Sequence, residues 1–463
     1  MEIRVVYGVI DMKTKSYEID MCNGTLLDKI FLFTIPLMLS SILQLLFNAA
    51  DIVIVGRFVG PQALAAVGST GPLVNLLLNV FTGFSLGSNI LVSKYIGSGN
   101  KRDVSEVVHT SVTFSVLCGI VLIFIGMFLA RPLLLLMGTP EDVIDQATLY
   151  IQIYFSGMPV LMLHNFCTSI LRAVGDTKRP LYYLVAGGVI NVLLNIFFVT
   201  QLHIGVAGVA LATVLSFILS AGLTVRCLVK SDGMYKLDLK KLRIHKDKLR
   251  KIVQVGLPAG LYGVVFSLSN MVIQSSINSF GSIAMAGSTA AGNIEGFIYM
   301  AMNAFHSTAL SFTAQNYGAR KIDRVKRIFI LCLICVTVTG LVMGIFAYIF
   351  GHQLLGIYSS DAQVIKYGLL RMAVICTTYF SVGIMEVLVG VLRGLGCSVM
   401  PTVVSIIGAC GVRILVIYTI FQIEPTLTVL YLSYPLSWGL TSVAHLICFI
   451  VVYKRLSKSI SEM

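Results

Sequence analysis

Charged residues are scarce in this chain, and their scarcity limits what kind of protein it can be. Only 12% of its 463 residues are Asp, Glu, Lys or Arg, whereas 57% are hydrophobic. A water-soluble domain of this size cannot bury that much apolar surface in one core. The composition therefore excludes a soluble protein and indicates an integral membrane protein.

The sequence also lacks the motifs of common metal and nucleotide sites. Its seven histidines form neither H-x-x-H nor H-E-x-x-H, and no phosphate-binding G-x-x-x-x-G-K-[ST] loop occurs. We therefore expect no enzyme activity, no cofactor and no bound metal cluster. If the protein moves a substrate uphill, an ion gradient must supply the energy, because nothing in the sequence indicates ATP hydrolysis.

The ten cysteines do not have the spacing of a disulfide framework or a metal site. Cys332 and Cys335 form a C-x-x-C pair, but the pair lies in the middle of an apolar run. Small polarizable side chains pack well between helices at such positions. We expect the cysteines to have packing roles.

Long apolar runs are abundant instead. A run of about 20 apolar residues spans a bilayer as a helix. Spans must be helices or closed barrels, because the bilayer core offers the backbone no water, and these runs are too long for barrel strands. The sequence therefore predicts an all-α membrane protein with twelve transmembrane helices, at 30–55, 66–93, 106–129, 146–173, 180–200, 205–229, 251–278, 287–311, 327–350, 363–392, 400–422 and 426–452.

The chain repeats itself after half its length. The segment LRAVGDTKRP, which ends at Pro180, recurs as LRGLGCSVMP, which ends at Pro401, and Pro36 recurs as Pro258. Such a repeat predicts two pseudo-symmetric lobes of six helices each. We expect an N-terminal tail, an N-lobe, a charged linker, a C-lobe and a C-terminal tail, at 1–27, 28–229, 230–250, 251–453 and 454–463.

The basic residues predict the orientation in the membrane. Nearly all of the 34 Lys and Arg residues fall in the tails or in loops on one side of the twelve-span map, and only Arg57 and Arg131 fall in loops on the other side. The positive-inside rule then puts both termini in the cytoplasm, as in a multi-pass protein of the inner (cytoplasmic) membrane. Residues 1–24 have no signal-peptide core. The net charge of +13 therefore reflects topology and not nucleic-acid binding.

One polar cluster is expected inside the N-lobe. At about 1.5 Å per residue, Asp51 and Asn195 reach the same depth near the outer ends of the first and fifth spans. Asn191 lies one turn below Asn195, Asn48 lies three residues before Asp51, and Thr213 enters the sixth span nearby. A carboxylate surrounded by amide and hydroxyl groups is suited to bind a proton or a small cation.

The C-lobe spans hold their own charged residues, Glu295, Glu386 and Arg413. Ionisable groups inside the bilayer are costly and are functional by default. Glu295 and Arg413 have similar depths, so they could form a buried ion pair; alternatively, Glu295 is a free site for substrate or protons. Glu386 lies nearer the cytoplasmic end, where it could attract a cationic substrate.

Several motifs together resemble a known family. A duplicated six-helix unit carries Asn48-x-x-Asp51, the segment LAAVGST, the turn LRAVGD-x-x-x-P with its repeat LRGLG-x-x-x-P, and AQNYGAR. The order of these motifs over residues 28–455 resembles the multidrug and toxic compound extrusion (MATE) family. The resemblance implies a V-shaped pair of lobes around a central cavity, and export of cationic or aromatic compounds in exchange for protons or sodium.

The resemblance carries over to individual residues unevenly. Asp51, Asn191 and Thr213 match the family's cation site in the N-lobe, whereas Asn195 stands where some relatives have a second aspartate. Val382 stands where some relatives have a C-lobe aspartate. The chain is thus more similar to the proton-coupled branch of DNA-damage-inducible-like exporters than to the sodium-coupled branch, although Na⁺ at Asp51 stays an alternative.

These observations lead to one functional hypothesis with alternatives. We expect a secondary active multidrug antiporter that works by alternating access, without nucleic-acid partners and as a monomer in the lipid bilayer. Its substrates would be small amphiphilic or cationic molecules. A flippase for lipid-linked glycans or another amphiphile is the alternative; it should have a strongly cationic cavity. A scaffold or receptor that transports nothing would give no reason for isolated carboxylates in the spans.

Overall fold

The computed structural model describes residues 17–461, and all regular structure within this range is helical. Residues 1–16 and 462–463, which belong to the two predicted tails, lie outside the described residues. The N-lobe consists of α1 (Leu27–Phe58), α2 (Pro61–Gly97), α3 (Lys101–Leu136), α4 (Glu141–Ser156), α5 (Met158–Ala173), α6 (Lys178–Thr200) and α7 (Val206–Val229). The C-lobe consists of α8 (Lys246–Asn278), α9 (Ser282–Gly318), α10 (Ile322–Ile349), α11 (Gly351–Gly356), α12 (Ala362–Thr378), α13 (Phe380–Gly394), α14 (Val399–Ser405), the π-helical turn η2 (Ile406–Gly411), α15 (Val412–Tyr418), α16 (Ile420–Ile423) and α17 (Leu427–Ser461). A short 3₁₀ turn, η1 (Leu239–Lys241), lies in the linker between the lobes.

The helices follow the twelve predicted spans in chain order. Within the described residues, nine helices are long and apolar enough to cross a membrane, and the bent pair of α12 and α13 makes a tenth. The two other predicted spans correspond to α9 and to the pair of α4 and α5. Helix α9 carries many small and polar residues because it is largely buried inside the C-lobe.

Three predicted spans are not continuous α-helices. The fourth breaks at Gly157, just before Pro159 in the first turn of α5, where a proline lacks the backbone donor that a continuous helix needs. The tenth bends by 45° where α12 meets α13, at Tyr379. The eleventh contains η2, where Gly408 packs against Thr441 of α17.

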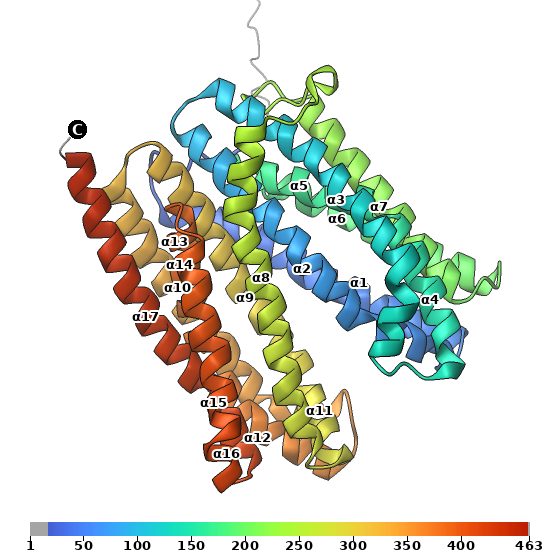
Figure 1. Ribbon diagram of the computed structural model, residues 1–463. Helices are drawn as coiled ribbons and strands as arrows, with labels where there is room; N and C mark the ends of the chain where they lie inside the picture. Colours follow the sequence, from blue (N-terminus) through green and yellow to red (C-terminus); the bar gives the residue numbers. More distant parts are fainter. Residues whose placement is uncertain (1–16, 462–463) are drawn as a thin grey trace, which may run out of the picture.

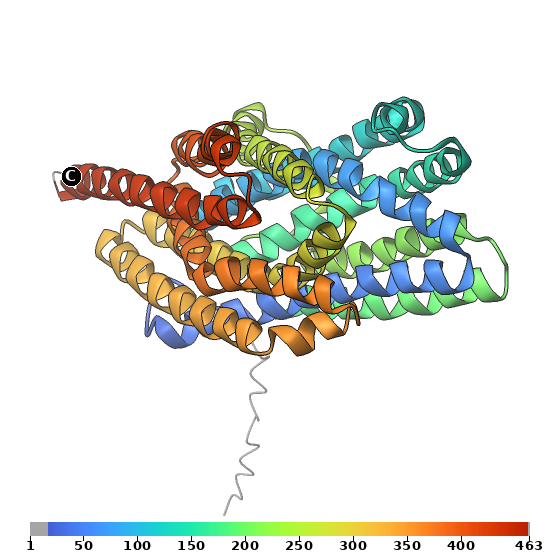
Figure 2. The same cartoon turned by 90° about the horizontal axis from the view of Figure 1, so that it is seen from below.

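The two lobes lie close together at one end and diverge at the other (Figure 1). The end where they meet carries the linker between α7 and α8 and the C-terminus of α17. Figure 2, from below, shows the orange and red helices of the C-lobe beside the green and blue helices of the N-lobe. The molecule therefore has the V shape that the family resemblance implies.

Glycines allow α2 of the N-lobe to pack directly against α8 of the C-lobe. A Cβ added at Gly83 would lie 2.5 Å from the backbone nitrogen of Gly260, and one added at Gly256 would lie 2.6 Å from the carbonyl oxygen of Gly83. Pairs of small residues four positions apart let helix backbones approach this closely in a membrane. These contacts join the lobes on the side where the V is closed.

The segment before α1 also connects the two lobes at that end. The backbone N–H of Ile19 donates to the carbonyl of Gly175 in the N-lobe, at 3.3 Å, and the Asn316 amide of the C-lobe donates to the carbonyl of Met21, at 3.0 Å. The Tyr235 hydroxyl of the linker donates to the carboxylate of Glu18. Burial and this carboxylate raise the pKa of Tyr235 to about 12, so its hydroxyl stays a donor at neutral pH.

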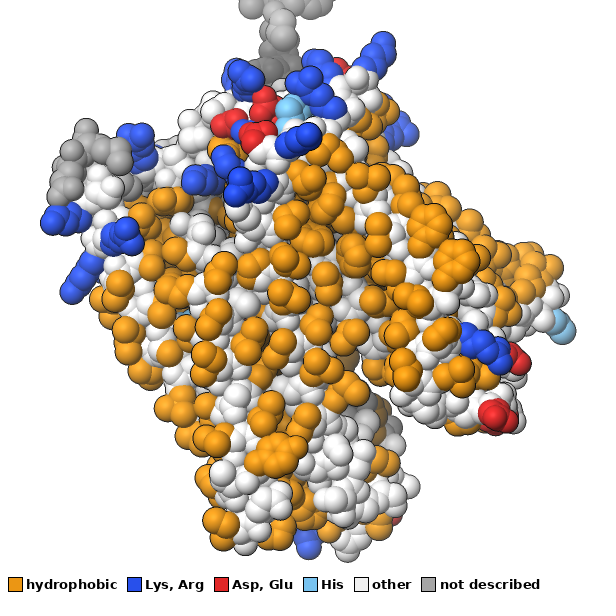
Figure 3. Space-filling view, in the orientation of Figure 1, with side chains coloured by type: hydrophobic (Ala, Val, Ile, Leu, Met, Phe, Trp, Pro, Cys, Tyr) orange, Lys and Arg blue, Asp and Glu red, His pale blue; other side chains and the backbone are white. Residues whose placement is uncertain are grey.

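Charged side chains are unevenly distributed over the surface. Figure 3 shows Lys and Arg gathered around the closed end of the V and a broad belt of hydrophobic side chains below them. Exposed apolar residues are abundant along α3, α10 and α17. Such a belt is expected where lipid tails, and not water, cover the protein.

Candidate functional site

The N-lobe cluster forms where α1, α6 and α7 meet. The Asn195 amide donates to Oδ1 of Asp51 at 2.6 Å and to Oδ1 of Asn191 at 3.2 Å. The Asn191 amide donates to the hydroxyl of Thr213 at 3.3 Å. Asn191 and Asn195 are one turn apart on α6 and therefore face the same neighbours. The structure thus brings together four of the five residues expected at this site.

Asn48 is the residue that does not join the cluster. Its side chain is exposed, and it makes no hydrogen bond to the described part of the chain. Three residues turn an α-helix by about 300°, so Asn48 points about 60° away from Asp51. This offset is large enough to take Asn48 off the face that meets α6.

Asp51 has neutral neighbours only. No ion pair within residues 17–461 involves its carboxylate, and Tyr150 and Tyr154 of α4 lie within electrostatic range of it. The carboxamide oxygen of Asn195 is buried and accepts no hydrogen bond from the described residues. A carboxylate without a cationic partner inside a helix bundle is suited to take up a proton or a cation.

A second polar site lies inside the C-lobe, in a cavity of about 390 Å³ between α8, α9, α12, α13, α15 and α17. All three C-lobe residues expected from the sequence, Glu295, Glu386 and Arg413, line it. Arg371 and Gln274 line it as well. The ring side chains around it are Phe266, Tyr299, Tyr379, Tyr434 and Trp438.

The predicted pair of Glu295 and Arg413 is wrong, because Glu295 binds Arg371. The Arg371 guanidinium donates from Nε to Oε1 at 2.8 Å and from Nη2 to Oε2 at 2.7 Å, and a third N–H donates to Ser288 at 2.8 Å. This bidentate geometry satisfies both carboxylate oxygens. Arg371 lies inside the predicted span 363–392, so its charge is a sequence signal for this pair.

Arg413 is one of three buried arginines in the described part of the C-lobe, together with Arg371 and Arg393. Arg413 lies on α15 and is fully buried. Its Nε donates to the hydroxyl of Ser437 at 3.0 Å, and its Nη1 donates to the amide oxygen of Asn270 at 3.2 Å. Both partners are neutral.

Glu386 is also partnered. Its Oε2 lies 2.9 Å from Nδ1 of His306, which in turn is 3.0 Å from the Glu386 carbonyl oxygen. Because both neighbours of this nitrogen are oxygen acceptors, Nδ1 carries the hydrogen. The carboxylate lines the cavity, but its Oε2 already contacts His306.

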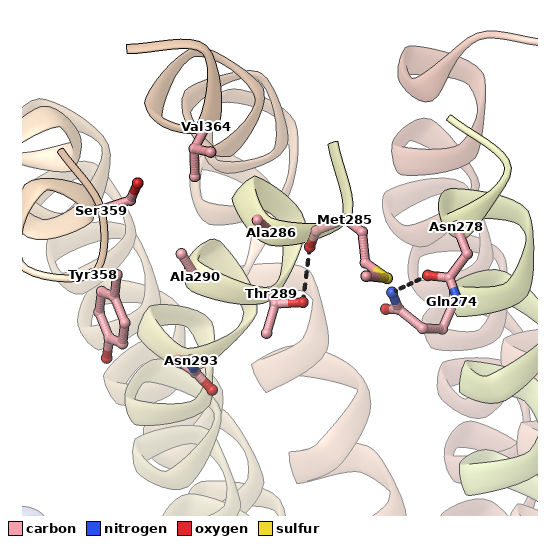
Figure 4. A pocket seen from close by; sticks show the side chains of 10 residues that line it. All are labelled: Gln274, Asn278, Met285, Ala286, Thr289, Ala290, Asn293, Tyr358, Ser359 and Val364. Atoms are coloured by element: carbon pink, nitrogen blue, oxygen red, sulfur yellow. Dashed lines mark hydrogen bonds between the residues drawn. The ribbon is translucent and has the colours of Figure 1, made fainter. Parts of the chain in front are cut away.

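A vestibule of about 600 Å³ lies at the end of the C-lobe away from the linker (Figure 4). Its polar lining carries no charge and includes Asn278, Thr289 and Asn293. Gln274 donates to Asn278 at 2.9 Å, and Gln274 lines both the vestibule and the C-lobe cavity. The cavity and the vestibule therefore adjoin each other.

The comparisons with known proteins agree with this architecture. The MatE family model matches residues 36–197 and again 258–419, one match in each lobe. The probable multidrug resistance protein YoeA of Bacillus subtilis is 31% identical over 396 residues, which cover 84% of this chain and 86% of that protein. The multidrug export protein MepA of Staphylococcus saprophyticus is 21% identical over 375 residues, or 81% and 83% of the two chains.

A solved structure has the same fold. It is described as the outward-facing conformation of a multidrug resistance MATE family transporter, and it superposes with a TM-score of 0.88 at 21% identity, over 95% of this chain and 98% of that one. The predicted all-α fold of twelve helices in two lobes is thereby confirmed. With one family match in each half, this chain belongs to the MATE family and is a multi-pass membrane transporter, not an enzyme.

Proposed function

We propose that this protein is a secondary active exporter of amphiphilic aromatic compounds, organic cations among them, and that Asp51 binds the coupling proton. The observation that carries the proposal is the isolation of Asp51. Its carboxylate lies in a helix bundle of a membrane transporter, and its one side-chain partner among the described residues is the neutral amide of Asn195. The names of the relatives YoeA and MepA support multidrug compounds as cargo.

The geometry of the cluster favours a proton over sodium. Asn195 turns its NH₂ group towards Asp51, and Asn191 turns its NH₂ group towards Thr213. Hard cations need several oxygen ligands at once. Asn195 presents an N–H donor to Asp51, and this arrangement supports a proton over a sodium ion as the coupling ion.

The shape of the molecule supports alternating access as the proposed mechanism. The lobes are joined by α2 and α8 at the linker end and diverge at the other, so this is the form open away from the linker. A proton drives the cycle only if it binds the two forms with different affinity. We propose that protonation of Asp51 favours substrate release and the return to the form open towards the linker.

A flippase for lipid-linked glycans is less well supported. It should have a strongly cationic cavity for a pyrophosphate group. The C-lobe cavity instead has two arginines and two glutamates in its lining, namely Arg371, Arg413, Glu295 and Glu386. This balance does not match a doubly anionic head group.

Transport by purified protein in liposomes tests the proposal. Ethidium movement would be followed by fluorescence while a pH gradient and a sodium gradient are imposed separately, each at zero membrane potential. We expect ethidium to move in the direction opposite to the proton flow. The sodium gradient should not drive its movement. Movement driven by sodium alone would overturn the assignment of the coupling ion, and no gradient-driven movement would overturn the proposed function.

The orientation gives a second testable prediction. We propose that the protein works as a monomer in the cytoplasmic membrane, with its linker 230–250 and both tails in the cytoplasm; the Lys and Arg side chains around the closed end support this. Single cysteines would be placed at the exposed positions Lys240, Gln62 and Gln363 in a cysteine-free variant. In intact cells a membrane-impermeant maleimide should label positions 62 and 363 but reach position 240 only after the membrane is opened. Equal labelling of all three would contradict the topology.

A further inference from the structure

The charges buried among the C-lobe helices do not balance. Three arginines, Arg371, Arg393 and Arg413, face two glutamates, Glu295 and Glu386, in the described membrane-spanning part of this lobe. The excess is one positive charge. A buried charge without a counterion is costly, so its location in a cavity of a transporter is informative.

Among the arginines that line the cavity, the one without a counterion is Arg413. Arg371 is compensated by the bidentate contact with Glu295. Arg393 does not line the cavity, and its Nε and Nη2 also lack acceptors among the described residues. Arg413 has neutral partners, and its Nη2 is buried without any acceptor in the described part of the chain. Arg413 therefore lines the cavity with one guanidinium nitrogen, Nη2, that has no hydrogen-bond acceptor among the described residues.

The same guanidinium is surrounded by aromatic rings. Its central carbon lies 4.4 Å from the ring centre of Tyr434, 5.4 Å from that of Trp438 and 5.5 Å from that of Phe266. The Tyr434 and Trp438 rings are 5.5 Å apart and inclined by 68°. Aromatic side chains in this arrangement provide an apolar wall for a flat ring close to a positive charge.

We propose that the C-lobe cavity binds an aromatic compound that carries one acidic group, with Arg413 holding the acid and Tyr434 and Trp438 contacting the ring. The inference rests on the proposed function and adds to it a substrate class, aromatic acids, for this cavity of the same transporter. The cavity of about 390 Å³ suits a compound of one or two rings. A carboxylate supplies the acceptors that Nη2 lacks.

A cation is the poorer ligand for this cavity. Both glutamates in its lining are already engaged, Glu295 by Arg371 and Glu386 by His306. A cation would therefore meet the uncompensated charge of Arg413 with no free carboxylate to offset it. The adjoining vestibule has an uncharged polar lining and does not select against an anion.

The only tryptophan of the chain reports on this site. Trp438 lines the cavity, so ligand binding can be followed by its fluorescence in detergent-purified wild-type protein. The probes would be 4-nitrobenzoate, 4-nitrobenzamide and 4-nitrobenzylammonium, which share a quenching ring and differ in charge. Because a hydrogen bond to a charged partner contributes about 1.5–3 kcal/mol, we expect saturable quenching by 4-nitrobenzoate with roughly ten- to hundredfold higher affinity than by the other two.

Variants distinguish the effect of the Arg413 guanidinium on binding from the effect of a change in the net charge of the protein. Arg413→Gln should lose the preference for 4-nitrobenzoate over 4-nitrobenzamide, and Arg413→Lys should keep part of it. Arg131→Gln removes the same charge at an exposed site on α3 and should bind like wild type. Binding to the detergent-purified protein needs no ion gradient, so a failure of proton coupling is distinguished from a failure of this site.

The wild-type measurement decides the matter even if an Arg413 variant does not fold. Equal affinity for the three probes, a preference for 4-nitrobenzylammonium, or no saturable quenching by any of them would overturn the proposal. An unchanged preference for 4-nitrobenzoate in folded Arg413→Gln would overturn the role of this arginine.

Discussion

Replacing Asp51 with asparagine is expected to abolish gradient-driven ethidium export while the protein still folds. Asparagine preserves the size of the side chain and can still bond to Asn195, but it cannot take up a proton. Since Asp51 has no cationic partner among the described residues, the substitution leaves no charge uncompensated. Transport in liposomes with an imposed pH gradient should fall to the rate of protein-free liposomes.

The neighbours of Asp51 provide the controls. Asn191→Ala and Thr213→Ala should weaken export less than Asp51→Asn, because water can replace a neutral hydrogen-bonding group. Asn48→Ala should have no effect, since Asn48 is exposed and turned away from the cluster. Wild-type export by Asp51→Asn, at equal protein amounts, would remove Asp51 from the coupling site.

Among the substitutions proposed for this protein, those that remove one partner of the buried Glu295–Arg371 pair should lower the free energy of unfolding most. Removal of one partner of a buried ion pair costs about 3–5 kcal/mol, because the other charge stays buried and unpaired. We therefore expect Glu295→Gln to lower the midpoint of thermal unfolding strongly in detergent, and Arg371→Gln to do the same. The double variant should regain much of the loss.

The matched comparison uses Arg413. In a double-mutant cycle, Glu295→Gln should couple strongly with Arg371→Gln and weakly with Arg413→Gln, because the guanidinium of Arg413 contacts Ser437 and Asn270 instead. Strong coupling between positions 295 and 413, with additivity between 295 and 371, would support the ion pair that depth alone suggested and contradict the one in the structure.

Depth along the membrane normal could be estimated from the sequence, and this explains which of the expected neighbours the structure brings together. Twelve apolar runs and the repeated turn motif sufficed for the fold and the family. Equal depth together with one-turn spacing on α6 was enough to join Asp51, Asn191 and Asn195. Depth was sufficient at this N-lobe cluster because it has few polar residues and because α1 and α6 pack against each other.

Position around the helix bundle could not be estimated in the same way. Glu295 and Arg413 have similar depths, but the side chain that reaches Glu295 comes from α12, and nothing in local sequence says which helix lies opposite. The charge of Arg371 within the predicted span 363–392 marks it as a candidate partner, but its depth does not identify Glu295 as the residue it contacts. The bend at Tyr379 and the π-helical turn in span 400–422 depend on tertiary packing, so the sequence did not predict them either.

One signal for the lobe contact was present in the sequence. Gly83 and Gly87 on α2, and Gly256 and Gly260 on α8, are each spaced four residues apart. This spacing is typical of close helix pairs in membranes. The pattern could have indicated that α2 and α8 hold the lobes together at the linker end.

Proton counterflow in wild-type liposomes tests the antiport most directly. The liposomes would start without a pH or sodium gradient, contain a luminal pH dye, and receive ethidium on the outside. Entry of ethidium down its gradient should drive protons out and raise the luminal pH. In liposomes that contain the Asp51→Asn variant, the luminal pH should stay constant. Ethidium entry through the wild-type protein at an unchanged luminal pH would contradict proton antiport.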